Sequence, residues 1–158
     1  MNEHLLKLIQ KYKSKGVLTD TNILVLYIIG SFDRSLIRKL KVTSQFSEDD
    51  FLRVARFIDY FNVKVTTPHV LTETSNLLKD RKDLHNVLKY YIENSEEENL
   101  DSKQLSQTGM FLGFGLADTA ISETAKDSYL IVTNENNLFG YLQNQGFDVV
   151  NLEQIRSI

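Results

Sequence analysis

The chain is predicted to fold as an α/β protein, a three-layer α/β/α sandwich around a central, mainly parallel sheet of four to five strands. Short runs of β-branched and other apolar residues alternate along the chain with longer segments of helical periodicity. The short runs lack the polar alternation of half-exposed strands, which is typical of parallel strands covered on both faces. With 158 residues, 42% of them hydrophobic, the chain is long enough for one buried core, and we expect a single domain over residues 1–158.

The elements expected in the first half follow from apolar spacing and from residues that begin helices. Ser47 and Asp50 resemble a capping box, and Thr67 followed by Pro68 is a typical helix entry. Because an apolar run ends at Gly30 and Asp33 is a good N-cap, we expect two helices or one broken helix at 22–41. The other expected elements are a helix around 5–12, a strand through Val17 and Leu18, a helix opened at Ser47, a strand at 62–66 and a helix continuing from Pro68 through VLTETSNLL.

In the second half, a polar and acidic segment separates two groups of expected elements. This segment, from Glu93 to Gln104, is interpreted as a solvated loop. The elements expected around it are helices at roughly 84–92, 110–125 and 137–143 and strands at 129–133 and 148–152.

Composition excludes several classes of protein. The chain has no cysteine, which rules out disulfides, thiolate zinc sites and a cysteine nucleophile. The N-terminus lacks the apolar core of a signal peptide, and the longest apolar run is too short to cross a bilayer, so we expect a cytoplasmic protein with no membrane partner. A net charge of -3 argues against nucleic-acid binding by bulk basicity.

Four acids follow the expected strands or stand among apolar residues. Asp20 lies where the first strand ends, Glu73 follows the second strand, and Glu135 follows YLIVT. Asp118 lies in an otherwise apolar part of the helix at 110–125. In open parallel sheets ligands bind beyond the carboxyl ends of the strands, so we expect these acids to converge there. A divalent cation would relieve their repulsion, and oxygen ligands without cysteine or paired histidine favour Mg²⁺ or Mn²⁺.

Each acid also has a simpler interpretation. Asp20 is placed to cap the following helix, and Glu73 and Glu135 are placed to interact with helix dipoles. A helix break at Gly113 or Gly115 would make Asp118 a cap as well.

Taken together, the motifs resemble those of the PIN-domain nucleases. The resemblance is carried by TDTN from Thr19, by Glu73, by GLADTAISETA around Asp118 and by IVTNENNLFGYLQNQGFDVVNL from Ile131, and it covers about residues 16–152. It implies a PIN-like fold and a Mg²⁺- or Mn²⁺-dependent ribonuclease; many members are toxins of toxin-antitoxin pairs, and others act in RNA processing or decay. One departure is Glu135, because the fourth motif usually has Asp two residues after the threonine.

The resemblance also implies roles for individual residues. Asp20, Glu73 and Asp118 would hold one or two metal ions, and Glu135 would close the site. Thr19, Asn22, Thr133 and Asn136 would support the ligands or position a phosphate, while Asn134 and Asn137 offer further neutral oxygens. The simpler interpretation is β-propensity for the two threonines and a turn or cap for the asparagines.

Two groups of basic residues follow segments that carry acids. They are Arg34, Arg38, Lys39 and Lys41, and Lys79, Arg81 and Lys82. They are candidates to hold an RNA backbone on either side of an acidic cleft, or they form ordinary solvated helix faces.

The leading hypothesis is a metal-dependent endoribonuclease with RNA as substrate. One form of this hypothesis is that the protein is the toxin of a toxin-antitoxin pair. The alternative is a PIN-like module that binds RNA or protein and has lost cleavage. A phosphatase would need an Asp-x-Asp arrangement near the first strand, where the chain has Asp20, Thr21 and Asn22. An antitoxin protein and a second copy of the chain are further candidate partners.

Overall fold

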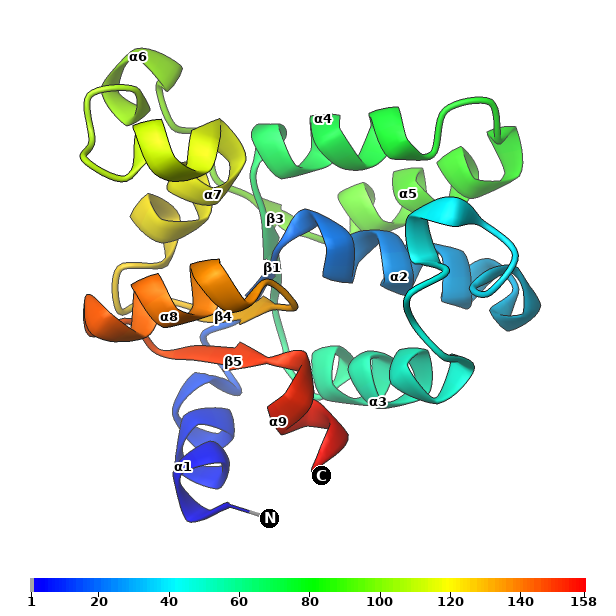
Figure 1. Ribbon diagram of the computed structural model, residues 1–158, viewed down its shortest axis with the longest axis horizontal. Helices are drawn as coiled ribbons and strands as arrows, with labels where there is room; N and C mark the ends of the chain where they lie inside the picture. Colours follow the sequence, from blue (N-terminus) through cyan, green and yellow to red (C-terminus); the bar gives the residue numbers. More distant parts are fainter. Residues whose placement is uncertain (1) are drawn as a thin grey trace.

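The five strands form one parallel sheet, as the computed structural model, which describes residues 2–158, shows (Figure 1). The strands are β1 (Val17–Thr19), β2 (Lys64–Thr66), β3 (Glu96–Glu97), β4 (Leu130–Thr133) and β5 (Val149–Asn151), and their order is β3-β2-β1-β4-β5. All pairings are parallel. Thr19 pairs with Val132, so β1 and the neighbouring β4 end close together at the carboxyl edge of the sheet. The predicted α/β/α sandwich is confirmed.

The helices begin largely where the sequence signals place them. Ser47 and Asp50 make both hydrogen bonds of a capping box, and the Thr67 hydroxyl accepts the amide of Val70 at 3.2 Å. The α-helices are α1 (Glu3–Tyr12), α2 (Thr21–Phe32), α3 (Glu48–Asp59), α4 (Pro68–Leu77), α5 (Lys82–Glu93), α6 (Ser102–Leu105), α7 (Phe111–Ala125), α8 (Asn136–Asn144) and α9 (Leu152–Arg156). Two 3₁₀ turns, η1 (Arg34–Leu36) and η2 (Lys41–Thr43), follow α2.

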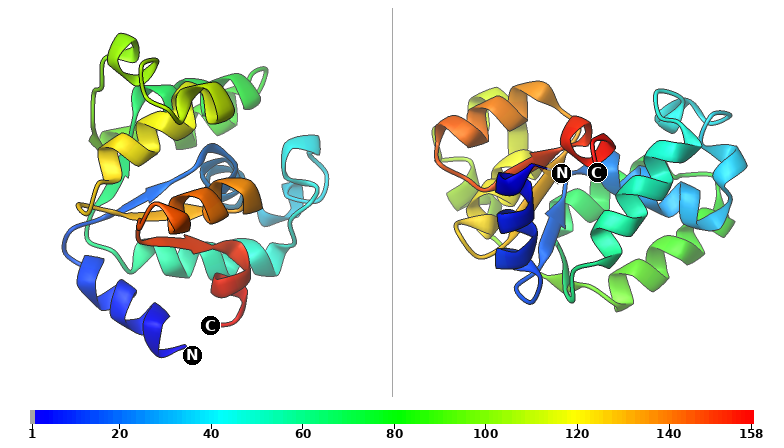
Figure 2. Two further views of the ribbon diagram at one scale, coloured as in Figure 1. Left: turned by 60° about the vertical axis from the view of Figure 1, so that its left-hand side comes forward. Right: turned by 90° about the horizontal axis from the view of Figure 1, so that it is seen from below.

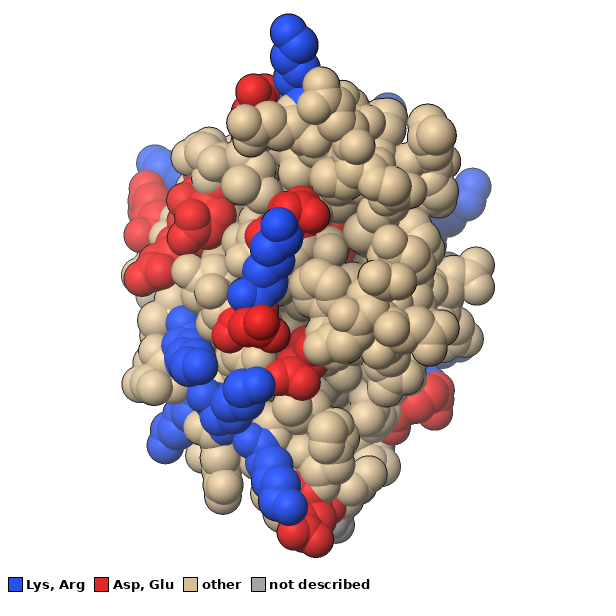
Figure 3. Space-filling model, turned by 90° about the vertical axis from the view of Figure 1, so that its left-hand side faces the viewer, with Lys and Arg blue, Asp and Glu red and all other residues tan. Residues whose placement is uncertain are grey.

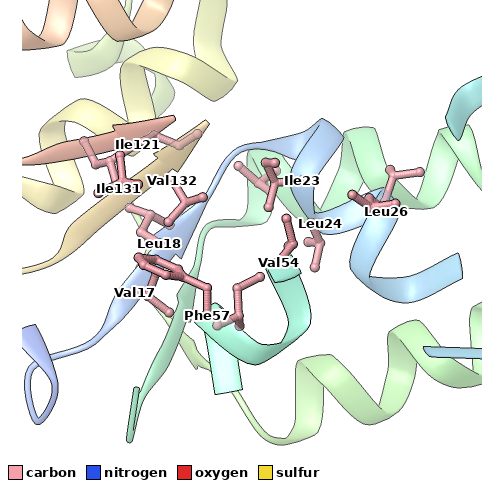
Figure 4. Packing of buried hydrophobic residues seen from close by; sticks show 14 of the residues in the cluster. Val17, Leu18, Ile23, Leu24, Leu26, Val54, Phe57, Ile121, Ile131 and Val132 are labelled. Carbon is pink, nitrogen blue, oxygen red and sulfur yellow. The ribbon is translucent and has the colours of Figure 1, made fainter. Parts of the chain in front are cut away.

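Helices cover both faces of the sheet. The left view of Figure 2 shows α7 on one side of the strands and α3 and α1 on the other. In the core, Val17 and Leu18 of β1 lie between Phe57 of α3 and Ile121 of α7 (Figure 4). Burial on both faces explains why the central strands β1 and β4 are buried along their whole length rather than alternating.

The segment after α2 differs from the prediction. Helix α2 continues through Gly30 to Phe32 rather than ending at the glycine. The glycine serves packing instead, because a Cβ at Gly30 would stand 2.2 Å from the Phe51 side chain. The prediction of a second helix before Lys41 is wrong, because only the 3₁₀ turn η1 forms there. The hydroxyl of Thr43 donates to the carbonyl of the buried Ile37 at 2.8 Å, a bond that a continued helix would make with a backbone amide.

The acidic segment at 93–104 is not simply a loop. Glu96 and Glu97 form β3 by backbone pairing with Val65 and Thr66 at the edge of the sheet, and their side chains stay exposed. Backbone pairing leaves no apolar pattern in such a strand, so the sequence carries no signal for it. The short helices α6 and α9 were not predicted either.

Within residues 2–158, no helix combines the length and the apolar character that crossing a membrane requires.

Candidate metal site at the carboxyl edge of the sheet

Asp20 is buried at the point where β1 passes into α2, and only 2% of it is exposed. Its backbone amide donates to the carbonyl of Val132 at 2.9 Å, which fixes it beside β4. Its carboxylate accepts the amide of Ile23 at 2.9 Å, the amide of Asn134 at 3.2 Å and the hydroxyl of Thr133. Asp20 therefore does cap α2, and it also faces the end of β4.

Burial raises the pKa of Asp20 to about 6, and the charge of Glu135 adds to the rise. The hydrogen bonds from Thr133, Ile23 and Asn134 oppose it by stabilising the charged form. The negative charge of Asp20 is therefore poorly compensated, because the carboxylate is buried, lies near another acid and receives hydrogen bonds only from neutral donors.

Glu73 reaches the same region from α4. It lies in the second turn of that helix, where the helix dipole has little effect, so the dipole interpretation does not explain it. The Thr21 hydroxyl, from the first residue of α2, donates to Glu73 Oε1 at 2.6 Å. The start of α2 thus orients a carboxylate carried by the neighbouring helix.

Asp118 lies after a kink in the predicted helix at 110–125. Gly115 has φ 82° and ψ -178°, a conformation that requires glycine, and it divides α7 into two segments. Asp118 is half-buried in the first turn of the second segment. The predicted helix break at Gly115 is confirmed, but within residues 2–158 the Asp118 side chain makes no capping hydrogen bond. Burial raises its pKa to about 7, and the charges of Glu135, Asp20 and Glu73 raise it further, which places these three acids within electrostatic reach of Asp118.

Glu135 stands at the N-cap of α8, yet its side chain makes no capping hydrogen bond. Its Oε1 lies 3.4 Å from Nδ2 of Asn22, a long contact. Its backbone amide donates at 3.0 Å to the hydroxyl oxygen of Thr133, whose proton is donated to Asp20. Thr133 therefore connects Glu135 with Asp20.

The supporting residues predicted from the sequence divide into two groups. Asn22 and Thr133 contact the acids, whereas Thr19 and Asn136 show no side-chain hydrogen bond to an acid within residues 2–158. Thr21 was missed; its signal was a hydroxyl in the first helical turn directly after Asp20. Asn134 also borders the site, and its buried Oδ1 has no hydrogen-bond partner.

The oxygen atoms available at this site are of the type that a hard divalent cation binds. The set consists of carboxylate oxygens and the unpartnered amide oxygen of Asn134, and in the described part of the chain no Lys or Arg forms an ion pair with any of the four acids. With the side chains as placed, no three His, Asp or Glu residues among 2–158 are grouped closely enough to hold an ion. Glu73 and Glu135 are exposed, so both side chains have room to change rotamer.

The predicted basic residues lie away from the acids. Arg34, Arg38 and Lys39 follow the C-terminal end of α2, which is about 18 Å long and begins beside Asp20. Lys79 and Arg81 follow α4, and Arg81 is held by Asp83 at 2.7 Å. In Figure 1 both groups lie on the right of the molecule, so they do not flank the acids on two sides.

A different group of basic residues was not predicted. The exposed lysines at 7, 11, 13 and 15 are carried by α1 and the turn after it. Figure 3 shows positive charge gathered on the lower part of the face to which α1 belongs.

No family model, curated protein or solved structure matches the chain, so its function is inferred from the fold and the acid cluster.

Proposed function

We propose that the protein is a metal-dependent, PIN-like endoribonuclease that hydrolyses RNA phosphodiester bonds at Asp20, Glu73, Asp118 and Glu135 with Mg²⁺ or Mn²⁺. The observation that carries the proposal is a set of contacts at the carboxyl edge of a parallel sheet: Thr133 joins Asp20 to Glu135. Thr21, the residue after Asp20, holds Glu73, and the charges of these acids also act on Asp118. Carboxylates that repel one another without a paired cation cost stability, which is typical of a site kept for function.

The four acids would hold the ion in different ways. Asp20 is rigid because three donors fix its carboxylate, and Asp118 is carried by a helix close to the kink at Gly115. Glu73 and Glu135 are exposed and are oriented by Thr21 and Asn22. When bound, the ion supplies positive charge beside the phosphate and lowers the pKa of a water.

Histidine chemistry is a poor alternative at this site. His69 lies on α4, one turn before Glu73, but its Nε2 lies 2.9 Å from Ser102 Oγ and its Nδ1 is buried. Neither nitrogen is placed to take a proton from a ribose hydroxyl. With water as the nucleophile, the bond from phosphorus to the 3′ oxygen breaks, and the fragments carry 5′-phosphate and 3′-hydroxyl ends.

The first test is cleavage of single-stranded RNA by purified protein with Mn²⁺, followed by analysis of the fragment ends. We expect Asp118→Asn to lower the rate at least about a hundredfold, since even residues that only orient metal ligands commonly contribute a factor of about ten to a hundred. Glu123→Gln is the matched control on the same helix, because Glu123 pairs with Lys126 outside the site. Cyclic phosphate ends, formed in the presence of chelator, would contradict the proposal.

The alternative is a PIN-like module that binds RNA or protein without cleaving. It is favoured by the finding that no three candidate ligands among residues 2–158 are grouped for an ion as placed. The longer side chain of Glu135 distinguishes the two functions. If it binds the ion, Glu135→Asp should keep much of the cleavage rate and Glu135→Gln should lower it at least about tenfold. Full activity of Glu135→Gln would remove it from the site.

The toxin role and an antitoxin partner are proposed on the family resemblance alone. Induced expression of the wild type should then arrest growth, and expression of Asp118→Asn should not.

A further inference from the structure

We propose that the hollow between α4 and α7, beside Glu73, binds the base of an unpaired nucleotide. This inference rests on the proposed ribonuclease function and extends it from the phosphate to the base.

The hollow adjoins the acids directly. It has a volume of about 320 Å³ and is lined by Pro68, His69, Thr72, Glu73, Leu116 and Ala117. Glu73 belongs both to the hollow and to the acid cluster, and Ala117 immediately precedes Asp118. A nucleotide whose phosphate lies at the acids therefore has this hollow within reach of its base. Figure 1 shows α4 and α7 next to each other.

The size of the hollow limits what it accepts. Its volume lies at the low end of the range for small-molecule pockets, which suits a single planar ring system better than a base pair within a duplex. A base can enter only when it is unstacked and turned out of its strand, as in the recognition of single-stranded RNA.

The lining residues suit a neutral planar group. Pro68, Leu116 and Ala117 are apolar, and His69 offers mainly ring surface because its Nε2 is engaged with Ser102 and its Nδ1 is buried. Histidine rings stack on unpaired bases in RNA-binding sites. No Lys or Arg lines the hollow, and the Glu73 carboxylate repels anions while it accepts hydrogen bonds from amino groups of a base. The phosphate and the base are thus assigned to different parts of the site.

The test uses ligands that the protein cannot cleave. Binding of adenosine 5′-monophosphate and of ribose 5-phosphate, which lacks the base, is measured by calorimetry in the presence of Mn²⁺. We expect the nucleotide to bind at least about tenfold more tightly, in keeping with the contribution of a stacked base. Equal affinities, or no binding of either ligand, would overturn the inference.

Two variants separate the His69 ring from its hydrogen bond. His69→Ala should reduce the difference in affinity to about twofold or less, because it removes the stacking surface. Ser102→Ala removes the same hydrogen bond but keeps the ring, so it should preserve the difference. Leu116→Asn changes the opposite, half-exposed wall and should also reduce it. Equal loss in His69→Ala and Ser102→Ala would show a structural effect and contradict base stacking.

A cleavage experiment distinguishes failure of this inference from failure of the proposed function. The wild type should cut a single-stranded RNA and leave the same sequence intact within a duplex. Equal cutting of both would overturn the inference while leaving the nuclease in place. Base-dependent binding without any cleavage would remove the nuclease and leave the base-binding hollow standing.

Discussion

Asp20 and Asp50 are the two acids among residues 2–158 that are almost fully buried, with 2% and 5% exposed, and their surroundings are opposite. Asp50, in the capping box of α3, accepts the guanidinium of Arg156 from α9 at 2.7 and 2.9 Å and the amide of Ser47 at 3.0 Å. These contacts, of which the one with Arg156 has the largest effect, hold the pKa of Asp50 below its usual value despite burial. Asp20 has only neutral donors, and burial raises its pKa.

The direction of the pKa shift therefore distinguishes the two carboxylates: the charge of Asp50 stabilises the fold, whereas the charge of Asp20 is unfavourable in the folded state. Two fork-like hydrogen bonds and a full positive charge compensate Asp50. The capping bond of Asp20 contributes to α2, but repulsion from Glu135 and Asp118 offsets part of that gain. Within residues 2–158, no Lys or Arg pairs with Asp20, whereas Arg156 pairs with Asp50.

The largest expected effect comes from adding a divalent cation to the region around Asp20. An ion that binds only the folded state stabilises it, by about 2.7 kcal/mol at roughly one hundred times the dissociation constant. Mn²⁺ should therefore raise the melting temperature of the wild type in calorimetry and should raise that of Asp118→Asn much less.

Asp50→Asn is the matched control for this measurement, because it changes a buried aspartate outside the cluster. It should lower the starting stability and keep the full Mn²⁺ shift. An equal shift in Asp118→Asn and the wild type would place metal binding elsewhere in the molecule.

The next effect concerns the ion pair between α3 and α9. Arg156→Met keeps the aliphatic stem but leaves the Asp50 carboxylate without its cation, so we expect a loss of about 2 kcal/mol at pH 7 in urea unfolding. Because the folded pKa of Asp50 is lowered, this contribution is complete above its ordinary value of 3.8 and disappears as the pH falls through the folded pKa. The cost of Arg156→Met should therefore shrink in acid.

Lys7→Met serves as the comparison, since Lys7 and Glu3 form an exposed pair that should contribute almost nothing. A constant cost of Arg156→Met from neutral pH to below pH 3.8 would mean that packing, rather than the ion pair, stabilises this contact.

The smallest effect distinguishes two acids within the candidate site. Without metal, Asp118→Asn should raise the free energy of unfolding by about 1 kcal/mol, because it removes a repelling charge and breaks no side-chain hydrogen bond seen in residues 2–158. Asp20→Asn should lower it by about 1 kcal/mol, because an amide cannot accept all three hydrogen bonds. Urea unfolding in chelator measures both, and changes of the same sign would refute the comparison.

Much of the fold was predictable because its signals are local. The capping box at Ser47, the Thr67 and Pro68 entry and the apolar strands act through neighbouring residues or through burial on both faces, and the structure bears them out. Strand β3 was not predictable, because it pairs through its backbone at the sheet edge and shows exposed glutamates. The prediction for the segment after α2 was wrong for a similar reason, because no local pattern shows that the Thr43 hydroxyl, six residues along the chain, bonds the carbonyl of Ile37 in place of a helical amide.

The candidate site divides in the same way. The sequence alone determined which carboxylates follow the strands, since strand ends and acids are both visible in it, and a parallel sheet brings such positions to one edge. Only the tertiary structure decided that Thr21 orients Glu73, that Thr133 joins Asp20 to Glu135, and that the His69 Nε2 lies beside the Ser102 hydroxyl. Each of these contacts joins residues that are far apart in the chain or depends on the rotamer of a side chain. The packing of α2, α4, α6 and α7 determines which residues meet and which rotamers fit, and no local sequence pattern does so.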